Sequence, residues 1–376
     1  MKCIDNAEKS RYNISIISER DETERVIFMA ISIKDVALEA GVSKTTASDA
    51  LNNLSKVKPE TRKKVLNVAK KLGYKPNISA RELITRKKLN LGIVNINKYA
   101  SIINSNAGYF KCADDESFFD IVSIIMDKIS KTQYGLLMET LQATDNDLPI
   151  PEFLKSDRVA GIIIVSTMYN PPKYIEKIKQ YTQNVVSVGS YYDQCDCVRN
   201  DYESAIYKAV EYLIQNGHRK IGFINGDKKS WAYNQKWSGF QKALADYGYP
   251  ICENWITDAE FVGRSGYEAV KRLWERPGEK PTALCFSADI IACGALRYFY
   301  ENGVNVPGDV SLIGFENSIL AAFSTPPLTT IDRCKRQMGV VACDLIMNRL
   351  ENSNAPYRDV IVPFSLWEGG SVKKYN

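Results

Sequence analysis

Histidine is almost missing from this sequence: the 376 residues contain one, His218. A catalytic triad built on histidine would have to use that residue, and a zinc site with two or more histidine ligands is excluded within one chain. His218 stands between a helix-like stretch and an apolar run that begins at Ile221, so we expect it to cap or pack there. Long apolar runs are missing too. None approaches the ~18 residues needed to cross a bilayer, which excludes a membrane span.

The motifs of common enzyme classes are also missing. There is no Gly-x-x-x-x-Gly-Lys phosphate loop, no Gly-x-Ser-x-Gly nucleophile elbow and no Gly-x-Gly-x-x-Gly dinucleotide fingerprint. We therefore predict that the protein is not an enzyme, has no catalytic residues and uses no cofactor. The first 28 residues lack the apolar core of a secretory signal, so a cytoplasmic location is expected.

The nine cysteines are scattered and odd in number, unlike a disulfide framework. Several lie in apolar runs such as Leu284-Cys285-Phe286, which is typical of buried, reduced thiols. Cys195 and Cys197 form a close pair, but no second cluster of ligands accompanies them. No metal site is predicted.

Positive charge is concentrated near the start of the chain. Residues 29–90 carry fourteen Lys and Arg against five Asp and Glu, a net charge of +9, whereas residues 1–28 sum to −1 and the remaining residues to −3. A local excess of positive charge of this size is typical of a segment that binds a polyanion, and nucleic acid is the first candidate for that ligand. A solvated basic face is the alternative.

Residues 32–72 have the pattern of three short helices. Ser32 and Ser43 are placed to cap the first and second helices, and Pro59 opens the third. Gly41 and Gly73 are predicted to end the first and third helices. Two short helices joined by a glycine turn in basic surroundings fit a helix-turn-helix.

From residue 89 onward, apolar runs alternate with helical patterns. This alternation predicts an α/β fold with parallel sheets and helices on both faces, and the length favours two similar lobes with a ligand cleft between them. The expected strands are Leu91–Asn95, Gly135–Met138, Gly161–Val165, Val185–Val188, Ile221–Asn225, Ala283–Phe286 and Val310–Gly314, and the expected helices are Ile121–Lys131, Tyr202–Asn216, Lys236–Tyr247, Ser265–Glu275 and Ile290–Asn302.

The order of motifs from residue 30 to 368 resembles the LacI/GalR family of transcription regulators. The segment from Ser32 to Ser48 carries the closest resemblance, and the later matches keep the family's order without interruption. These matches are Leu51-Asn52, Val57–Arg62, Leu72–Asn77, Ala80–Leu83, Gly217–Gly222, Val310–Phe315 and Pro326–Ile331.

The resemblance implies four segments. Residues 1–28 are expected to form a disordered extension, 29–76 the helix-turn-helix domain, and 77–88 a hinge helix with its linker. Residues 89–370 are expected to form a periplasmic-binding-protein-like domain for effector binding and dimerisation. Within it, lobe 1 is expected to hold about 89–188 and 316–345, and lobe 2 about 189–315 and 346–370.

The resemblance also implies how DNA is bound. The second helix of such regulators enters the major groove, and the hinge helix inserts an apolar side chain into the minor groove. Asp49 departs from the family, which often carries arginine or another donor at this position. Its carboxylate can accept a hydrogen bond from cytosine N4; the alternative is that it is a solvated charge on the helix surface. Leu83 is the expected wedge, with core packing as the alternative. The implied DNA-binding residues are Ser43, Lys44, Thr45, Thr46, Ser48, Asp49, Asn52, Asn77, Arg81 and Leu83.

The implied effector site lies at strand ends of both lobes. Aromatic faces with a carboxylate suit a sugar or a related polar ligand. Asp289 is expected to contact the ligand or to cap a helix, and Lys236 replaces an arginine usual in sugar-binding members. Residues 96–116 look like a lengthened loop over the cleft mouth. The implied effector-binding residues are Phe118, Phe119, Thr167, Lys236, Phe261 and Asp289. Trp231 and Trp237 are either stacking platforms or core.

Two functions from different classes remain. The first is an effector-controlled DNA-binding regulator, more often a repressor, acting as a homodimer on a near-palindromic double-stranded operator. The second is a solute-binding receptor of the same bilobed fold without a DNA role. The basic helix-turn-helix and the absence of an export signal favour the first.

Overall fold

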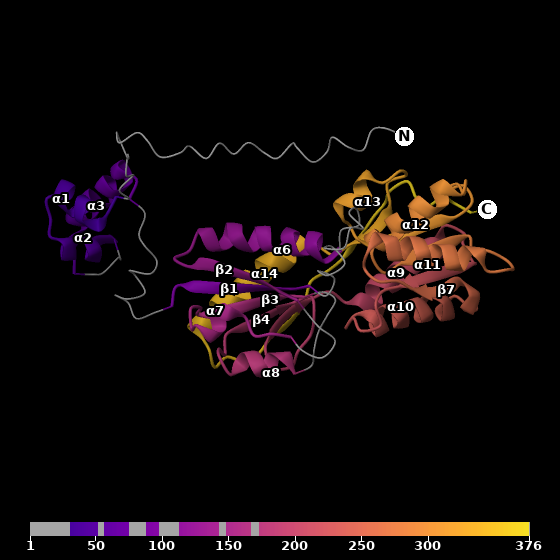
Figure 1. The fold of residues 1–376 in the computed structure, drawn as a ribbon, viewed down its shortest axis with the longest axis horizontal. Coiled ribbons are helices and arrows are strands. Elements are labelled where there is room, and N and C mark those ends of the chain that lie inside the picture. Colours follow the sequence, from indigo (N-terminus) through magenta and orange to yellow (C-terminus); the bar gives the residue numbers. More distant parts are fainter. Residues whose placement is uncertain are drawn as a thin grey trace, which may run out of the picture. The chain divides into compact units, whose positions relative to one another are not determined.

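The structure of the protein is a computed structural model that describes residues 31–51, 56–74, 88–97, 113–142, 148–166 and 173–375. The chain divides into two compact units, Met1–Asn77 and Ile78–Asn376 (Figure 1). The boundary lies inside the segment expected to be the hinge, after its first residue, Asn77. Among the described helices, none is both long and apolar enough to cross a bilayer.

The first unit contains three short helices, as predicted. They are α1 (Ile33–Ala40), α2 (Lys44–Leu51) and α3 (Pro59–Leu72). The amide and the hydroxyl of Ser32 both donate to Asp35 Oδ2 at 2.8 Å, which satisfies a free amide where α1 begins. Gly41 and Gly73 end α1 and α3 with φ of 63° and 67°, the left-handed conformation that glycine adopts freely. Both predicted helix ends are confirmed.

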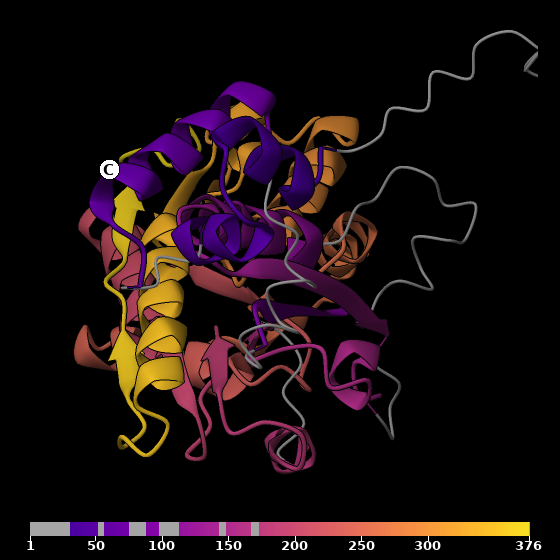
Figure 2. The same ribbon diagram turned by 90° about the vertical axis from the view of Figure 1, so that its left-hand side faces the viewer.

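The second unit consists of two lobes, each built on one six-stranded sheet (Figure 1; Figure 2 gives the view turned by 90°). The sheet of lobe 1 has the strand order β11-β5-β4-β3-β1-β2, and all its neighbouring strands are parallel. Helices α6 and α14 cover one face, and α7 and α8 the other. The elements of this lobe are β1 (Asn90–Asn97), α6 (Ala113–Ser130), β2 (Gly135–Gln142), α7 (Glu152–Lys155), β3 (Gly161–Val165), α8 (Tyr174–Lys179), β4 (Val185–Val188), β5 (Asp196–Arg199), α14 (Lys335–Glu351) and β11 (Asp359–Ile361).

Lobe 2 repeats this layered plan. Its sheet has the order β12-β10-β9-β8-β6-β7 and is parallel except for β12, which pairs antiparallel with β10. Helices α9 and α10 cover one face, and α11 and α12 the other. The elements are α9 (Tyr202–Gln215), β6 (Ile221–Asn225), α10 (Tyr233–Asp246), the 3-10 helix η1 (Glu253–Trp255), β7 (Ile256–Asp258), α11 (Gly263–Glu275), β8 (Ala283–Phe286), α12 (Asp289–Glu301), β9 (Ser311–Glu316), α13 (Ile319–Phe323), β10 (Thr329–Asp332) and β12 (Ser365–Trp367).

The chain passes between the lobes at three places in its described part: after β5, after β10 and after β11. Asn200, just after β5, joins all three connections. Its amide nitrogen donates to the carbonyl oxygens of Arg333 (3.0 Å) and Val362 (3.1 Å). Because Asn200 is fully buried, these bonds are shielded from water, and they hold the three connections together at the junction of the lobes.

The lobe boundaries expected from the sequence need correction. Strand β5 was expected in lobe 2 but belongs to the sheet of lobe 1. Residues 316–334 were assigned to lobe 1, yet α13 and β10 belong to lobe 2, and α14 with β11 then returns to lobe 1. The apolar pattern of a short strand does not reveal which sheet it joins, so these assignments required the tertiary structure.

His218 has the packing role expected for it. Its ring is buried, with Nδ1 3.0 Å from Thr282 Oγ1 and Nε2 3.2 Å from the carbonyl oxygen of Lys373. Burial lowers the pKa of the imidazole. The ring therefore joins the region before β8 to the C-terminal segment as an internal hydrogen-bonding residue.

Candidate functional sites

The second helix of the first unit presents a polar face. Ser43 Oγ accepts a hydrogen bond from the Thr46 amide (3.0 Å) and lies 2.8 Å from Thr46 Oγ1, so Ser43 caps α2 as predicted. Lys44 and Thr45 are exposed at the start of α2, whereas Ser48 and Asp49 are half-buried along it. The helix thus offers side chains of the type that reads base edges at its N-terminal end.

Helix α3, which shares a core with α2, is rich in basic residues. Lys56 and Lys58 precede α3, which carries five more: Arg62, Lys63, Lys64, Lys70 and Lys71. Among them, Lys71 forms an ion pair with Glu39 at 3.0 Å. Exposed cations of this kind are suited to contacts with phosphates. Asn52, Asn77, Arg81 and Leu83 lie outside the described residues, and the DNA-contact assignments all remain predictions.

In the second unit, Lys236 lies at the carboxyl-end edge of the lobe 2 sheet, on the first turn of α10. Its Nζ donates to the carbonyl oxygen of Ser287 at 2.7 Å and lies 4.2 Å from the ring centroid of Phe315. The rings of Tyr202 (5.3 Å) and Phe261 (5.8 Å) complete an aromatic surround. Burial lowers the pKa of this lysine to about 7. The side chain is therefore a buried donor rather than a solvated charge.

Asp289 is the first residue of α12 and is fully buried. Its Oδ1 accepts from Thr330 Oγ1 (2.7 Å) and its Oδ2 from the amide of Ser318 (2.8 Å), the residue that caps α13. Burial raises the pKa of this carboxyl to about 7. The N-cap of α12 is Ala288, so Asp289 links α12 to α13 and β10 instead of capping its own helix. Its contact with a ligand remains a prediction.

An ion pair that the sequence analysis missed lies beside Lys236. Arg333 Nη1 is 3.2 Å from Glu316 Oε1, and both side chains are almost completely buried. The guanidinium also donates to the hydroxyl of Tyr202 (2.9 Å) and to Asn200 Oδ1 (3.1 Å). Glu316 ends β9 and Arg333 follows β10, so attention to polar residues at strand ends would have found both.

The remaining predicted effector residues have different environments. Phe118 is buried in the core of lobe 1, whereas the neighbouring Phe119 is 58% exposed and meets it edge-on at 5.3 Å between centroids. Phe261 is buried beside Gly226, where a Cβ would lie 2.2 Å from its ring. Thr167 and positions 98–112 of the expected long loop lie outside the described residues. The structure therefore brings Lys236 and Phe261 together, and the ligand roles of the predicted residues remain predictions.

The two tryptophans differ. Trp237 stacks on Phe240 (5.7 Å) and Phe223 (6.3 Å) and packs against the core of lobe 2. Trp231 is half-buried and meets the ring of Tyr202 edge-on at 5.8 Å. Trp237 is core, and Trp231 lies next to the aromatic surround of Lys236.

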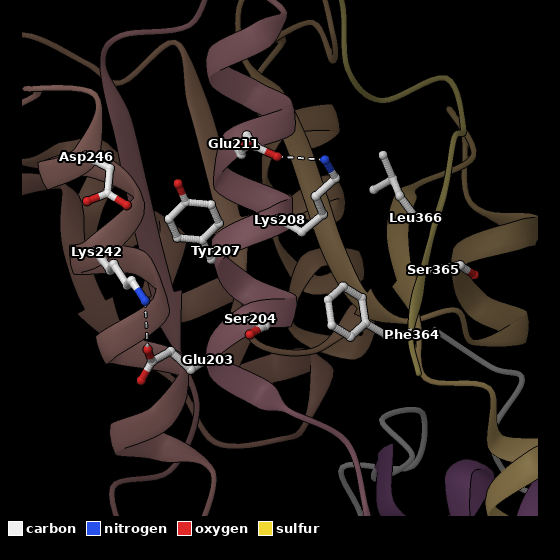
Figure 3. Close-up of a pocket in the computed structure, with 10 residues that line it drawn as sticks. All are labelled: Glu203, Ser204, Tyr207, Lys208, Glu211, Lys242, Asp246, Phe364, Ser365 and Leu366. Atoms are coloured by element: carbon white, nitrogen blue, oxygen red, sulfur yellow. Dashed lines mark hydrogen bonds and ion pairs between the residues drawn. The ribbon is translucent and has the colours of Figure 1, made fainter. Parts of the chain in front are cut away.

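A separate pocket lies on the surface of lobe 2, between α9, α10 and the segment that contains β12 (Figure 3). Four of its five charged groups form two ion pairs: Lys208 Nζ is 2.7 Å from Glu211 Oε2, and Lys242 Nζ is 3.7 Å from Glu203 Oε1. The pocket is lined by Glu203, Ser204, Tyr207, Lys208, Glu211, Lys242, Asp246, Phe364, Ser365 and Leu366. Because these residues include none of the predicted effector contacts, this pocket is distinct from the predicted cleft.

A basic three-helix unit followed by a two-lobed α/β unit defines the class of a DNA-binding regulator with a ligand-binding domain, and the comparisons with known proteins agree. Residues 32–77 match the model of bacterial regulatory proteins of the lacI family, and residues 210–372 match the periplasmic binding protein-like domain. Catabolite control protein A of Priestia megaterium is 31% identical over 339 residues, which cover 89% of this chain and 97% of the relative. The chain belongs to the LacI family.

Other relatives share both units. An HTH-type transcriptional repressor PurR of Escherichia coli is 30% identical over 345 residues, covering 91% of this chain and 96% of the relative. Among solved structures, the lac repressor dimer bound to operator and the anti-inducer ONPF has a TM-score of 0.71 at 22% identity, covering 91% of this chain and 99% of that one. The CelR–cellobiose complex has a TM-score of 0.63 with the same identity and coverage. The expected fold, with its helix-turn-helix and two parallel-sheet lobes, is confirmed.

Proposed function

We propose that this chain is a transcriptional repressor that binds a near-palindromic operator as a homodimer in the cytoplasm. Its affinity for the operator changes when a small effector binds between its lobes. The observation that carries the proposal is the presence, in one chain, of a basic helix-turn-helix unit and a two-lobed unit, each matching its part of the family. The match over residues 32–77 favours this function over a solute receptor without a DNA role.

Operator binding depends on α2 and the hinge. Lys44 and Thr45 are exposed where α2 begins, which supports contacts to bases or phosphates in the major groove. Arg81 and Leu83 act in the hinge, where Leu83 enters the minor groove. Asp49→Arg changes operator preference rather than abolishing DNA binding, because it replaces an acceptor for cytosine N4 with a donor for guanine. A selection from random DNA measures this, and identical preferences for both proteins would contradict the role of Asp49.

Homodimer formation is supported by exposed apolar side chains on both lobes. On lobe 1, Met126 of α6 and Met138 of the edge strand β2 are 55% and 52% exposed. On lobe 2, Ile319 and Phe323 of the short helix α13 are 61% and 82% exposed. A second copy of the chain that packs against both lobes would cover these apolar side chains. Light scattering of Phe323→Ser against the unmodified protein tests this.

For the effector, we propose a sugar or sugar derivative. Phe261 provides an aromatic face beside Lys236, and regulators of the same fold have been solved with cellobiose and with ribose. Lys236 offers one ammonium in place of a planar guanidinium, and its Nζ already donates to Ser287. A thermal-shift screen over sugars, sugar phosphates, nucleosides and nucleobases identifies the class, because a ligand at ~100 times its Kd stabilises by about 2.7 kcal/mol.

A mobility-shift experiment with the DNA upstream of the protein's own gene tests the whole proposal. We expect a complex whose affinity falls steeply with salt, because phosphate contacts release counterions. The variant Lys44→Ala is expected to weaken that complex, while the control Lys242→Ala on lobe 2 leaves it unchanged. A protein that binds neither this DNA nor random duplex at low salt would refute a DNA-binding function.

A further inference from the structure

Arg199 stands where the chain leaves lobe 1. It is the last residue of β5 and directly precedes Asn200, which joins the three connections between the lobes. Asp359 of the neighbouring strand β11 holds its guanidinium through two contacts, Nε to Oδ1 at 3.0 Å and Nη2 to Oδ2 at 2.6 Å. A two-point contact of this kind fixes both the position and the plane of the guanidinium.

The guanidinium contacts one aromatic ring from each lobe. The carbon Cζ of Arg199 lies 5.5 Å from the ring centroid of Tyr191 and 5.7 Å from that of Trp231. Tyr191 belongs to the loop after β4 in lobe 1, and Trp231 to the loop between β6 and α10 in lobe 2. Both loops leave the carboxyl ends of parallel strands, the edges that border a ligand cleft in such sheets. The arginine therefore bridges the two lobes at the cleft.

The same contacts lead to the cluster around Lys236. Trp231 meets the ring of Tyr202 edge-on at 5.8 Å. The ring of Tyr202 in turn faces the ammonium of Lys236 at 5.3 Å, and its hydroxyl accepts from Arg333. Trp231 also precedes α10, whose first turn carries Lys236. A movement of Trp231 relative to Arg199 therefore changes the position of groups that line the proposed effector site.

We infer that Arg199 is a positioning residue for effector binding: by contacting Tyr191 and Trp231 together, it holds the two lobes at a set separation across the cleft. This inference rests on the proposed function for its consequence, since lobe movement is the signal that would reach the operator. Its physical content, a contact that couples two loops of different lobes, is tested without DNA or effector.

Cation–π contacts of a partly exposed arginine favour the bridged arrangement by a modest factor. Loss of one ring is expected to raise the population of the opened arrangement about threefold to tenfold. Arg199 itself belongs to lobe 1, so the contact that crosses between the lobes is the one with Trp231, and Tyr191 helps to hold the guanidinium where Trp231 meets it. Once Trp231 is lost, loss of Tyr191 therefore adds little. This dependence of one ring on the other distinguishes a bridge from two independent packing contacts.

The experiment is hydrogen–deuterium exchange of the full-length protein without ligand. The variants are Tyr191→Leu, Trp231→Leu and the double variant, with Tyr191→Phe retaining the ring and Tyr300→Leu as control, since Tyr300 is 86% exposed on α12. We expect either single variant to speed exchange about threefold to tenfold in both loops, residues 189–195 and 227–232, with no further increase in the double variant. Tyr300→Leu should match the unmodified protein, and Tyr191→Phe, which keeps the ring, should leave the coupling between the two loops intact.

Two results would overturn the inference: faster exchange confined to the mutated loop, or additive effects of the two variants. Thermal unfolding of each variant shows whether the fold is intact, and a variant that unfolds early is replaced by Arg199→Lys, which keeps the charge and loses the planar contact. If exchange behaves as expected but no protein binds DNA, the proposed function fails and the bridge stands. If DNA binding is normal and the loops are uncoupled, only the bridge fails.

Discussion

Replacing Lys236 with methionine tests the electrostatics of the proposed effector site most directly. Lys236 is buried, and its ammonium has aromatic faces and one carbonyl oxygen as its nearest partners in the described structure. Lys236→Met keeps the apolar length of the side chain and removes the charge. The surrounding rings of Tyr202, Phe261 and Phe315 accept a thioether well.

The size of the expected change in unfolding free energy follows from the pKa of the lysine, which burial lowers from 10.5 to about 7. At ~1.36 kcal/mol for each pH unit between these values, the cost of holding the charged form in the folded protein is on the order of 5 kcal/mol. Below pH 7 both the folded and the unfolded states carry the proton, so the whole cost is present. Between pH 7 and 10.5 the unfolded state binds more protons, and stability rises with pH.

We therefore expect Lys236→Met to be more stable than the unmodified protein at pH 6, by about 2–4 kcal/mol once the lost hydrogen bond to Ser287 is subtracted. The difference shrinks as pH rises toward 10. Urea unfolding from pH 6 to pH 10 measures both, with Lys242→Met as the control because that lysine is 60% exposed. The reasoning is refuted if Lys236→Met and the unmodified protein lose or gain stability in parallel across this range.

Three further predictions concern buried groups. Burial raises the pKa of Asp289 to about 7, so the folded protein loses stability as the pH rises from about 4 to 7 and the carboxyl ionises. The variant Asp289→Asn should remove that loss, which urea titrations at pH 5 and pH 8 measure. An unchanged pH dependence of the unfolding free energy would contradict this. Glu316→Gln leaves the buried Arg333 without its ion-pair partner and should cost about 3–5 kcal/mol of unfolding free energy, most of which is recovered by adding Arg333→Met. Equal unfolding free energies of the single and the double variant would disprove the pairing. Gly266→Ala should lower the Tm measured by calorimetry by several degrees, because the added Cβ would lie 2.2 Å from the carbonyl oxygen of Ile291. Overpacking of this kind typically costs about 1–3 kcal/mol of unfolding free energy. An unchanged Tm would show that α11 and α12 can move apart without cost.

Much of the fold was predictable because apolar runs and capping residues act locally. The strands Gly161–Val165, Val185–Val188 and Ile221–Asn225 have the predicted bounds, since each is a continuous apolar run buried on both faces of a parallel sheet. Helix α14 was not predicted, although it covers the sheet of lobe 1, and strands β11 and β12 have three residues each. Short strands carry too little periodicity to stand out from loops.

The same distinction between local and distant partners applies to the candidate site residues. Ser43 was identified as a helix cap because a hydroxyl directly before a helix has a local partner, and the structure confirms that bond. The roles of Glu316 and Arg333 were missed because their partners are distant in sequence. Asp289 was expected to contact the ligand or to cap a helix. It does not cap its own helix, and its oxygens accept hydrogen bonds from Ser318 and Thr330, which lie 29 and 41 residues further along the chain. Its contact with a ligand stays a prediction.

The amino-acid order alone determined that this chain carries a basic three-helix head and alternating strands and helices behind it. Those properties depend on charge, on neighbouring side chains and on periodicity, which are all local. Tertiary structure decided which sheet each strand joins, that Lys236 is buried among aromatic rings, and that Arg199 reaches a ring of each lobe. Burial and long-range contact arise only when segments far apart in the chain pack together, because the local sequence does not contain the partners that set them.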